Sequence, residues 1–194
     1  MKCDDRKVAG ALLFFGSAQF LLFLVITESL YPGYSVSQNY ISDLGVGTTS
    51  LIFNSSVFLL GLTVAVGAYF FQHAFDSKLL AILFTITGLG AMGVGLFPEN
   101  FGVIHGVVSL ITFLFGGLSA IMSYKLQKSP LSYASVLLGV LSLVALALFG
   151  SSIYLGLGKG GMERMIAYPT LLWAVGFSSY LMRYSKKTDT ATKS

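Results

Sequence analysis

Six long apolar runs, separated by short polar connections, constrain this chain more than any other feature. A helical crossing of the hydrocarbon layer, which is about 30 Å thick, needs about 20 mostly apolar residues. Each run therefore predicts one transmembrane helix, and together they predict an all-α membrane protein that forms one transmembrane domain over residues 1–194. The predicted spans of this six-transmembrane-helix bundle are residues 8–26, 51–71, 79–97, 103–124, 131–154 and 166–182.

The composition excludes an ordinary soluble domain. Hydrophobic residues make up 55% of the chain and charged residues only 10%, whereas soluble domains carry about 25% charged residues. The runs are continuously apolar and do not alternate, which favours helices over a transmembrane β-barrel. The first run is longer than the roughly 7–15 apolar residues of a signal peptide and precedes no small-residue cleavage pattern, so we expect a retained helix.

The basic residues predict the orientation of the bundle. Cytoplasmic connections collect Lys and Arg, and all but two of the 12 Lys and Arg residues fall on the side of the N-terminus. The two exceptions are Lys159 and Arg164. We therefore expect both ends in the cytoplasm, with residues 183–194 as a basic cytoplasmic tail. The net charge of +4 then reflects topology in a multi-pass cell-membrane protein, and no nucleic-acid partner is expected.

Polar residues gather at the opposite, extracytoplasmic ends of the predicted helices. Partly buried ionisable groups in a membrane persist chiefly when they are paired or used. Candidates for acid-base chemistry are Asp43, Glu99, His105 and Glu163, although His105 could equally be a histidine that faces headgroups or is satisfied in the core. Candidates for ligand binding are Asn39, Ser42, Asn54 and Arg164.

The cofactor content stays unknown at this level. One histidine and three carboxylates could hold a cation, but no hydrolase or metal-binding motif is present. The planar guanidinium of Arg164 suits a carboxylate or a phosphate, so it could pair with Asp43, with Glu99 or with a lipid phosphate.

The connection from Glu28 to Ser50 is the longest in the chain. Its recurring tyrosine and aliphatic residues predict an interfacial segment that lies across the outer end of the bundle. Within it, Ser37 could cap a helical turn over residues 38–44 that Gly45 and Gly47 would end.

Several of these residues form motifs that resemble a known family. The motifs are residues 39–45 (NYISDLG), Asn54, the triplet 97–99 (FPE), His105 and residues 161–164 (GMER). In their order and spacing they resemble the domain of unknown function 998 family. That resemblance implies a small six-helix membrane protein of archaea or bacteria with no assigned activity. A more remote likeness of the ISDLG piece to the Frag1 and Sfk1 membrane families implies a leaning toward lipid-related roles and transfers no catalytic residue.

Two classes of function are compatible with these observations. One is a site that binds a lipid or other amphiphile, with or without hydrolase or transferase chemistry. The other is a non-enzymatic assembly partner or scaffold, in which membrane lipids, a second copy or another membrane protein would be the partner. A small transporter or channel is less favoured, because no charged side chain occupies the middle of a run.

Overall fold

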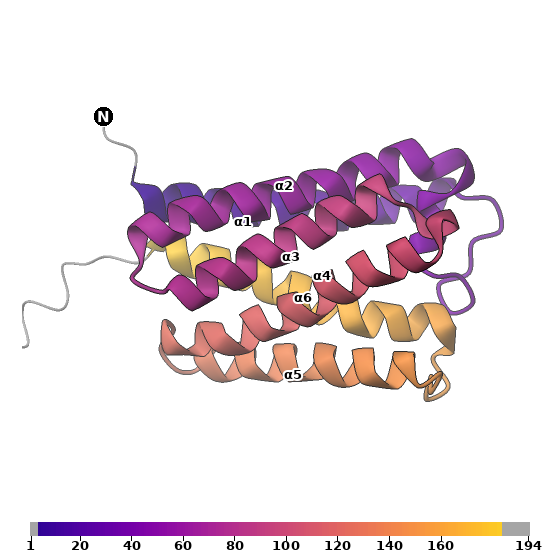
Figure 1. The fold of residues 1–194 in the computed structure, drawn as a ribbon. Coiled ribbons are helices and arrows are strands. Elements are labelled where there is room, and N and C mark those ends of the chain that lie inside the picture. The colour runs from indigo at the N-terminus through magenta and orange to yellow at the C-terminus, as the bar shows by residue number, and fades with distance from the viewer. Residues whose placement is uncertain (1–3, 184–194) are drawn as a thin grey trace, which may run out of the picture.

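The computed structural model describes residues 4–183 and consists of six long α-helices joined by short connections (Figure 1). All six are long and apolar enough to cross a membrane, which confirms the predicted all-α membrane fold. No strand occurs in residues 4–183. The expected orientation remains a prediction, and the expected basic tail beyond Arg183 lies outside the described residues. The helices are α1 (Asp5–Leu30), α2 (Ser50–Ala74), α3 (Lys78–Leu96), α4 (Val103–Met122), α5 (Leu131–Gly150) and α6 (Gly158–Arg183).

The helices form a closed ring. Each packs against the next in sequence, and α6 packs back against α1. The start of α1 and the end of α6 therefore lie at the same end of the bundle (Figure 1). Four short 3-10 turns lie in the connections: η1 (Ser42–Gly45), η2 (Gly47–Thr49), η3 (Glu99–Phe101) and η4 (Ser123–Lys125).

Glycines set the closest helix contacts. A Cβ atom built at Gly88 of α3 would lie 2.7 Å from the carbonyl oxygen of Gly61 in α2, so neither helix could approach as closely with a side chain there. The glycines of α3 therefore serve tight packing, as small residues commonly do between membrane helices.

Helices α4 and α5 approach each other closely at Gly117 and Gly139. There a Cβ atom at Gly139 would lie 2.7 Å from the carbonyl oxygen of Gly117. Toward Val103 and Gly150 the two helices diverge (Figure 1). A groove, described below, lies between them on that side.

The connection between α1 and α2 folds over one end of the bundle. We call residues 31–49 the cap segment. Its apolar side chains Ile41 and Leu44 are buried against α1, α2 and α6, as expected for a segment that covers the bundle end.

The predicted helical turn over residues 38–44 is wrong about where the turn begins. Regular 3-10 structure begins only at Ser42, because Gln38 and Asn39 instead close a turn onto the carbonyl oxygen of Ser35, at 3.1 and 2.8 Å. The Asn39 side chain also accepts a hydrogen bond from the Ser35 N–H at 3.0 Å. Ser37 does not cap η1, since no side chain does so.

Helix α6 begins at Gly158, before the predicted membrane span of residues 166–182. The glycine-rich stretch therefore forms its first turns, and Glu163 and Arg164 lie inside the helix. Both side chains are buried, at 8% and 5% exposure. Each of the two side chains pairs with polar groups of the cap segment, as the next section describes.

Candidate functional site

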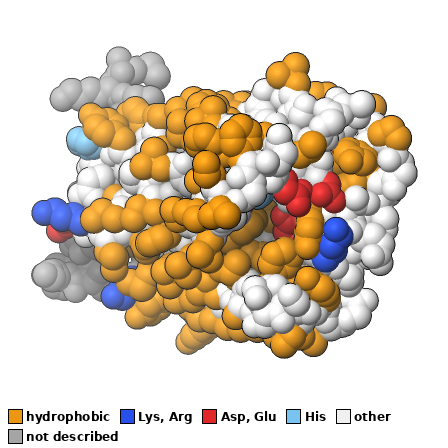
Figure 2. Space-filling model, turned by 45° about the vertical axis from the view of Figure 1, so that its right-hand side comes forward, with side chains coloured by type: hydrophobic (Ala, Val, Ile, Leu, Met, Phe, Trp, Pro, Cys, Tyr) orange, Lys and Arg blue, Asp and Glu red, His pale blue; other side chains and the backbone are white. Residues whose placement is uncertain are grey.

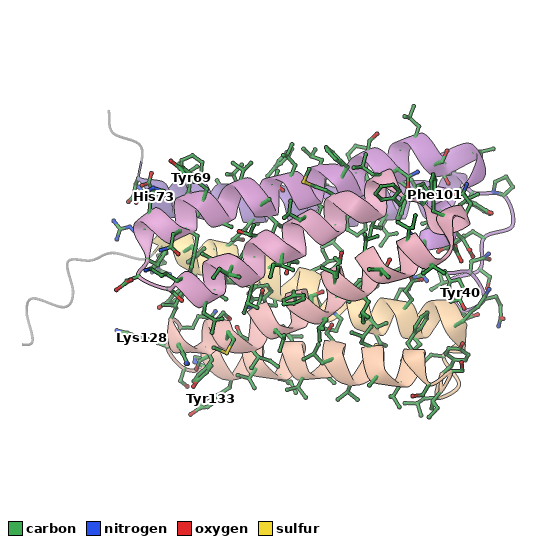
Figure 3. The ribbon with its side chains drawn as sticks, viewed as in Figure 1. Tyr40, Tyr69, His73, Phe101, Lys128 and Tyr133 are labelled. Carbon is green, nitrogen blue, oxygen red and sulfur yellow. The ribbon has the colours of Figure 1, made fainter. Side chains whose placement is uncertain are left out.

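Four carboxylates lie at the end of the bundle that the cap segment covers, which we call the carboxylate end. They are Glu28 at the end of α1, Asp43 in the cap segment, Glu99 in η3 and Glu163 in α6. Figure 2 shows acidic side chains gathered beside a basic one on a largely hydrophobic surface. Figure 3 places Tyr40 and Phe101 at this end and Tyr69, His73, Lys128 and Tyr133 at the other.

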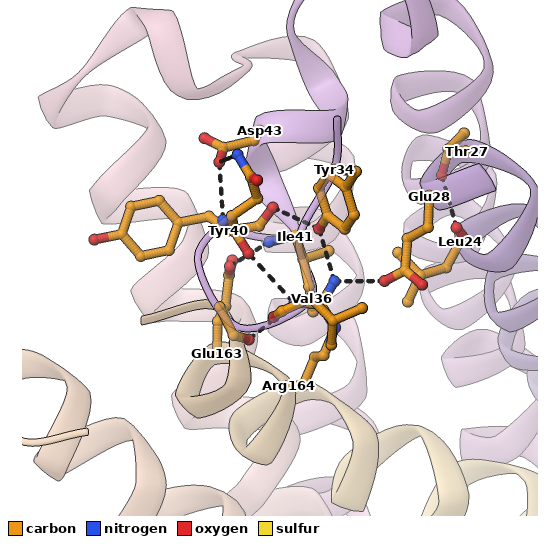
Figure 4. A network of polar contacts seen from close by, with 12 residues as sticks. Leu24, Thr27, Glu28, Tyr34, Val36, Tyr40, Ile41, Asp43, Glu163 and Arg164 are labelled. Atoms are coloured by element: carbon orange, nitrogen blue, oxygen red, sulfur yellow. Dashed lines mark hydrogen bonds and ion pairs between the residues drawn. The ribbon is translucent and has the colours of Figure 1, made fainter. Parts of the chain in front are cut away.

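Arg164 holds the cap segment in place (Figure 4). Its Nη2 forms an ion pair with Glu28 and donates to the Tyr34 hydroxyl at 2.6 Å. Its Nη1 donates to the carbonyl oxygen of Val36 at 3.0 Å and to that of Gly160 at 2.9 Å. The guanidinium thus joins α1, the cap segment and its own helix. Its carboxylate partner is Glu28, and neither Asp43 nor Glu99.

The glycines at the start of α6 allow the backbone of the cap segment to pack closely against this helix. The N–H of Gly160 donates to the carbonyl oxygen of Ser37 at 3.0 Å. A Cβ atom at Gly160 would lie 2.6 Å from the carbonyl oxygen of Val36 and closer still to that of Asn39. The glycine-rich stretch is therefore the surface on which the cap segment rests.

Glu163 meets the cap segment at a different place. Its Oε2 accepts a hydrogen bond from the N–H of Ile41 at 2.5 Å. Successive residues of an α-helix project about 100° apart, so Glu163 and Arg164 reach different parts of the same segment. Within residues 4–183 no donor contacts Oε1 of Glu163, although the residue is 92% buried.

Asn39 orders the cap segment from within, and Asn54 of α2 holds it from outside. Asn39 Nδ2 donates to Asp43 Oδ2 at 2.9 Å, and the same oxygen accepts from the N–H of Tyr40 at 2.9 Å. Asn54 Nδ2 donates to the carbonyl oxygen of Gly45 at 2.9 Å. These contacts order the backbone around η1 and anchor it to α2.

Glu99 lies beside Asp43, half-buried. Burial, and after it the neighbouring Asp43 carboxyl, raise the pKa of Glu99 to about 7, although Ser42 and Lys159 oppose the shift. At neutral pH this carboxyl is thus poised between its protonated and ionised forms, as a proton-exchanging group would be. Lys159 itself lies over the ring of Tyr40, 4.2 Å from its centroid.

His105 is oriented by two contacts in the first turns of α4. Its Nδ1 lies 2.8 Å from the carbonyl oxygen of Phe97. A carbonyl can only accept, so Nδ1 carries the hydrogen and Nε2 of the neutral ring is the acceptor. The hydroxyl of Ser109, one turn further along, lies 3.3 Å from Nε2. This pattern presents an imidazole lone pair to the space around Ser109.

A central cavity of about 110 Å³ runs inside the helix ring. Its lining on α4 extends from His105 to Ser119, about 20 Å at 1.5 Å of rise per residue. Ser42, His105 and Glu163 line its polar end. The remaining wall is mostly apolar and includes Phe20, Phe53, Phe84, Phe113, Leu171 and Trp173.

One polar atom on that wall has no partner. Ser17 is fully buried, and its hydroxyl makes no hydrogen bond within residues 4–183. Unpaired buried hydroxyls cost free energy. A bound molecule or water would therefore gain a hydrogen bond at this point of the cavity.

A second opening, the α4–α5 groove, has a volume of about 750 Å³. Its sides are apolar residues of the two diverging helices, among them Leu110, Leu114, Leu143, Leu146 and Ala147. Toward the carboxylate end the groove is polar. This part contains Tyr40, Glu99 and five residues that the groove shares with the central cavity. The shared residues are Ser42, His105, Ser109, Phe113 and Glu163.

The structure therefore brings together part of the sequence-predicted site. Ser42, Glu99, His105 and Glu163 line the α4–α5 groove, and Asp43 lies next to Glu99. Asn39, Asn54 and Arg164 line neither cavity and make protein contacts instead. Sequence reasoning missed Ser109, although its position four residues after His105 places both on one helix face.

The same residues do not form a metal centre in the described part of the chain. Within residues 4–183 no group of three histidine, cysteine or carboxylate side chains lies close enough to hold a metal ion. What the arrangement offers is acid-base chemistry: a carboxyl poised near neutral pH, an oriented imidazole and a buried carboxylate.

Six membrane-length helices closed into a ring define a multi-pass integral membrane protein. The chain belongs to the DUF998 family, described as proteins of unknown function, whose family model matches residues 14–180. No curated protein and no solved structure matches the chain.

Proposed function

We propose that this protein binds a lipid or other amphiphile at the junction of the central cavity and the α4–α5 groove. The apolar chain would occupy the central cavity, and the polar head would lie against Glu99, His105 and Glu163. The observation that carries this proposal is the set of five residues shared by an apolar interior cavity and a groove on the side of the bundle. A molecule with one polar and one apolar end matches both surroundings at once.

The size and lining of the cavity support an apolar occupant. An apolar cavity of about 150 Å³ in another protein stays dry and binds benzene, so a cavity of about 110 Å³ walled by aromatic and aliphatic side chains favours a hydrocarbon group over water. Its extent of about 20 Å along α4 suits a single alkyl chain.

Entry would be lateral. The groove lies between two helices whose walls are leucine and alanine, and a lipid tail can pass such walls without losing apolar surroundings. The cap segment, held by Arg164, closes the end of the bundle. In the predicted orientation the polar head would lie in the extracytoplasmic half of the membrane.

The single tryptophan gives a local readout. Trp173 is buried and lines the central cavity, so a bromine atom at the end of a bound alkyl chain would quench its fluorescence by contact. The test titrates the full chain, in a sugar-headed detergent, with 12-bromododecyl amphiphiles that carry neutral, cationic or anionic heads. Saturable quenching by at least one of them is expected.

Two glycine variants make the test specific. A Cβ atom at Gly106, in the groove, and one at Gly176, away from both cavities, would each meet nothing within 4 Å. Gly106→Phe should weaken binding by at least about tenfold, whereas Gly176→Phe should bind as the unaltered chain does. Equal quenching in all three proteins, or no saturable quenching, would overturn the proposal.

The proposal extends to chemistry on the bound head. His105 Nε2 is the base that could take a proton from water or from a lipid hydroxyl, as hydrolase or transferase chemistry requires. In that case His105→Gln should retain the quenching and lose product formation from a bound ester, measured by mass spectrometry. Unchanged product formation would exclude His105 as the base.

A scaffold role is the second candidate. Only 22% of the membrane-length windows of α4 and α5 is buried, against 44–50% in the other four helices, so these two helices leave room for a neighbouring protein. A photo-activated cross-linker at the exposed Leu137 of α5 should then give a discrete protein adduct in native membranes. Cross-links to lipid alone would count against this role.

A further inference from the structure

The groups around the proposed head position are predominantly acidic. Glu99 and Glu163 line the groove, and Asp43 adjoins Glu99. The basic side chain that acts on Glu99 is Lys159, which contributes one positive charge and lies over the Tyr40 ring. The net charge of the chain is +4, so this end of the bundle departs in sign from the protein as a whole.

The guanidinium of Arg164 does not neutralise these carboxylates, because it is paired with Glu28 outside the groove. Arg164 is 5% exposed, forms an ion pair with Glu28, and lines neither the cavity nor the groove. An anionic headgroup would therefore meet carboxylates without a free guanidinium to compensate. This removes the reason for expecting a phosphate at the site.

A buried acceptor points into the same space. Glu163 is 92% buried and lines both openings, yet its Oε1 receives no hydrogen bond from any described residue. The lone pair of His105 Nε2 is presented nearby, with only the Ser109 hydroxyl as a partner. Both groups are acceptors, and a head rich in N–H donors would satisfy them together.

We propose that the ligand is a long-chain amphiphile whose head carries a protonated amine, with Glu99 and Glu163 as its counter-charges. This inference rests on the proposed function, since it names the class of molecule that the same site takes. The ammonium group would donate to the free Oε1 of Glu163 and to Glu99, and the alkyl chain would extend toward Trp173.

The acid-base state of Glu99 fits this proposal. With its pKa raised to about 7, the carboxyl pays a cost for ionising that a bound ammonium would offset. Amine binding should therefore release a proton near neutral pH and should strengthen as the pH rises from about 6 to 8. The charged and titratable groups that face Glu99 are Asp43, Lys159, Glu163, Tyr40 and His105.

The experiment compares three probes with one chain and different heads: 12-bromododecylamine, 12-bromododecanol and 12-bromododecyl phosphate, each read by quenching of Trp173. The amine should bind at least about tenfold more tightly than the phosphate at pH 8. Glu99→Gln should reduce the amine's advantage and its pH dependence while leaving the alcohol's affinity unchanged. Since Gln is similar in size, the fold should persist, and the alcohol serves as the check.

Two failures can be told apart. If no probe gives saturable quenching that Gly106→Phe weakens, the proposed function itself is wrong. If the alcohol or the phosphate binds saturably, and as tightly as the amine, the site exists and the amine assignment is wrong.

Discussion

Glu28 and Arg164, at the end of the first helix and the start of the last, form an ion pair with side-chain exposures of 18% and 6% that closes the helix ring at the carboxylate end. The pair also orders the cap segment, because the same guanidinium donates to Tyr34 and to the Val36 carbonyl. The site on the other side of the segment is thus supported by residues that do not line it.

Breaking this pair should destabilise the protein strongly. Glu28→Gln leaves the guanidinium without its counter-charge in a buried setting, a change that costs about 3–5 kcal/mol. The free energy of unfolding in detergent would measure it. Asp4→Asn is the comparison, because the Arg6–Asp4 pair is more exposed, with side-chain exposures of 21% and 34%, so removing its carboxylate should cost less. Equal losses in the two variants would contradict the assignment.

Gly160→Ala should displace the cap segment. The new methyl group would overlap the carbonyl oxygens of Val36 and Asn39, and such overpacking costs about 1–3 kcal/mol. Faster proteolysis within residues 31–49 would report the displacement. Gly176→Ala, which adds a methyl group in open space, should be neutral or slightly stabilising because alanine favours the helix. A cap segment that stays protected in Gly160→Ala would refute this packing.

Glu99 should make the stability fall as the pH rises. Its pKa is raised from 4.5 to about 7 in the fold, so the folded state binds more protons than the unfolded state in that window. By linkage the free energy of unfolding then decreases between about pH 4.5 and pH 7 and levels off above it. The slope should be smaller in Glu99→Gln. Identical pH profiles for the two proteins would show that the carboxyl ionises normally.

Gly116→Leu should shorten the chain that the cavity accepts. A Cβ atom at Gly116 would lie 3.7 Å from Thr87 and 3.9 Å from Thr170, so the fold can take the extra atoms while the cavity loses volume. Mass spectrometry of the purified protein should show shorter bound chains than in the unaltered protein. An unchanged chain-length distribution would place the ligand's tail elsewhere.

The fold was largely predictable, since each apolar run became one helix. The start of α6 was not, because the glycines at 158, 160 and 161 read as a break in any helical pattern. Their role depends on the cap segment, far earlier in the chain, which packs on them through contacts such as the hydrogen bond from Gly160 to Ser37. Local sequence carries no record of that contact.

The site was predictable to the extent that its members share one end of the bundle. Glu99, His105 and Glu163 share the groove because each lies near a helix end on the same side of the bundle. The partner of Arg164 could not be chosen, since it depends on α6 packing against α1. Ser109 was missed because a serine inside an apolar run reads as a packing residue.

The divergence of α4 and α5 has a consequence for how such a site would be supplied. A groove that opens sideways between two helices would exchange its ligand with the surrounding bilayer. The occupancy of the site would then follow the mole fraction of that ligand among the neighbouring lipids. The concentration of the ligand in water would have little influence on this occupancy. A short, chainless amine should then compete poorly, whereas diluting the membrane with other lipids should empty the site.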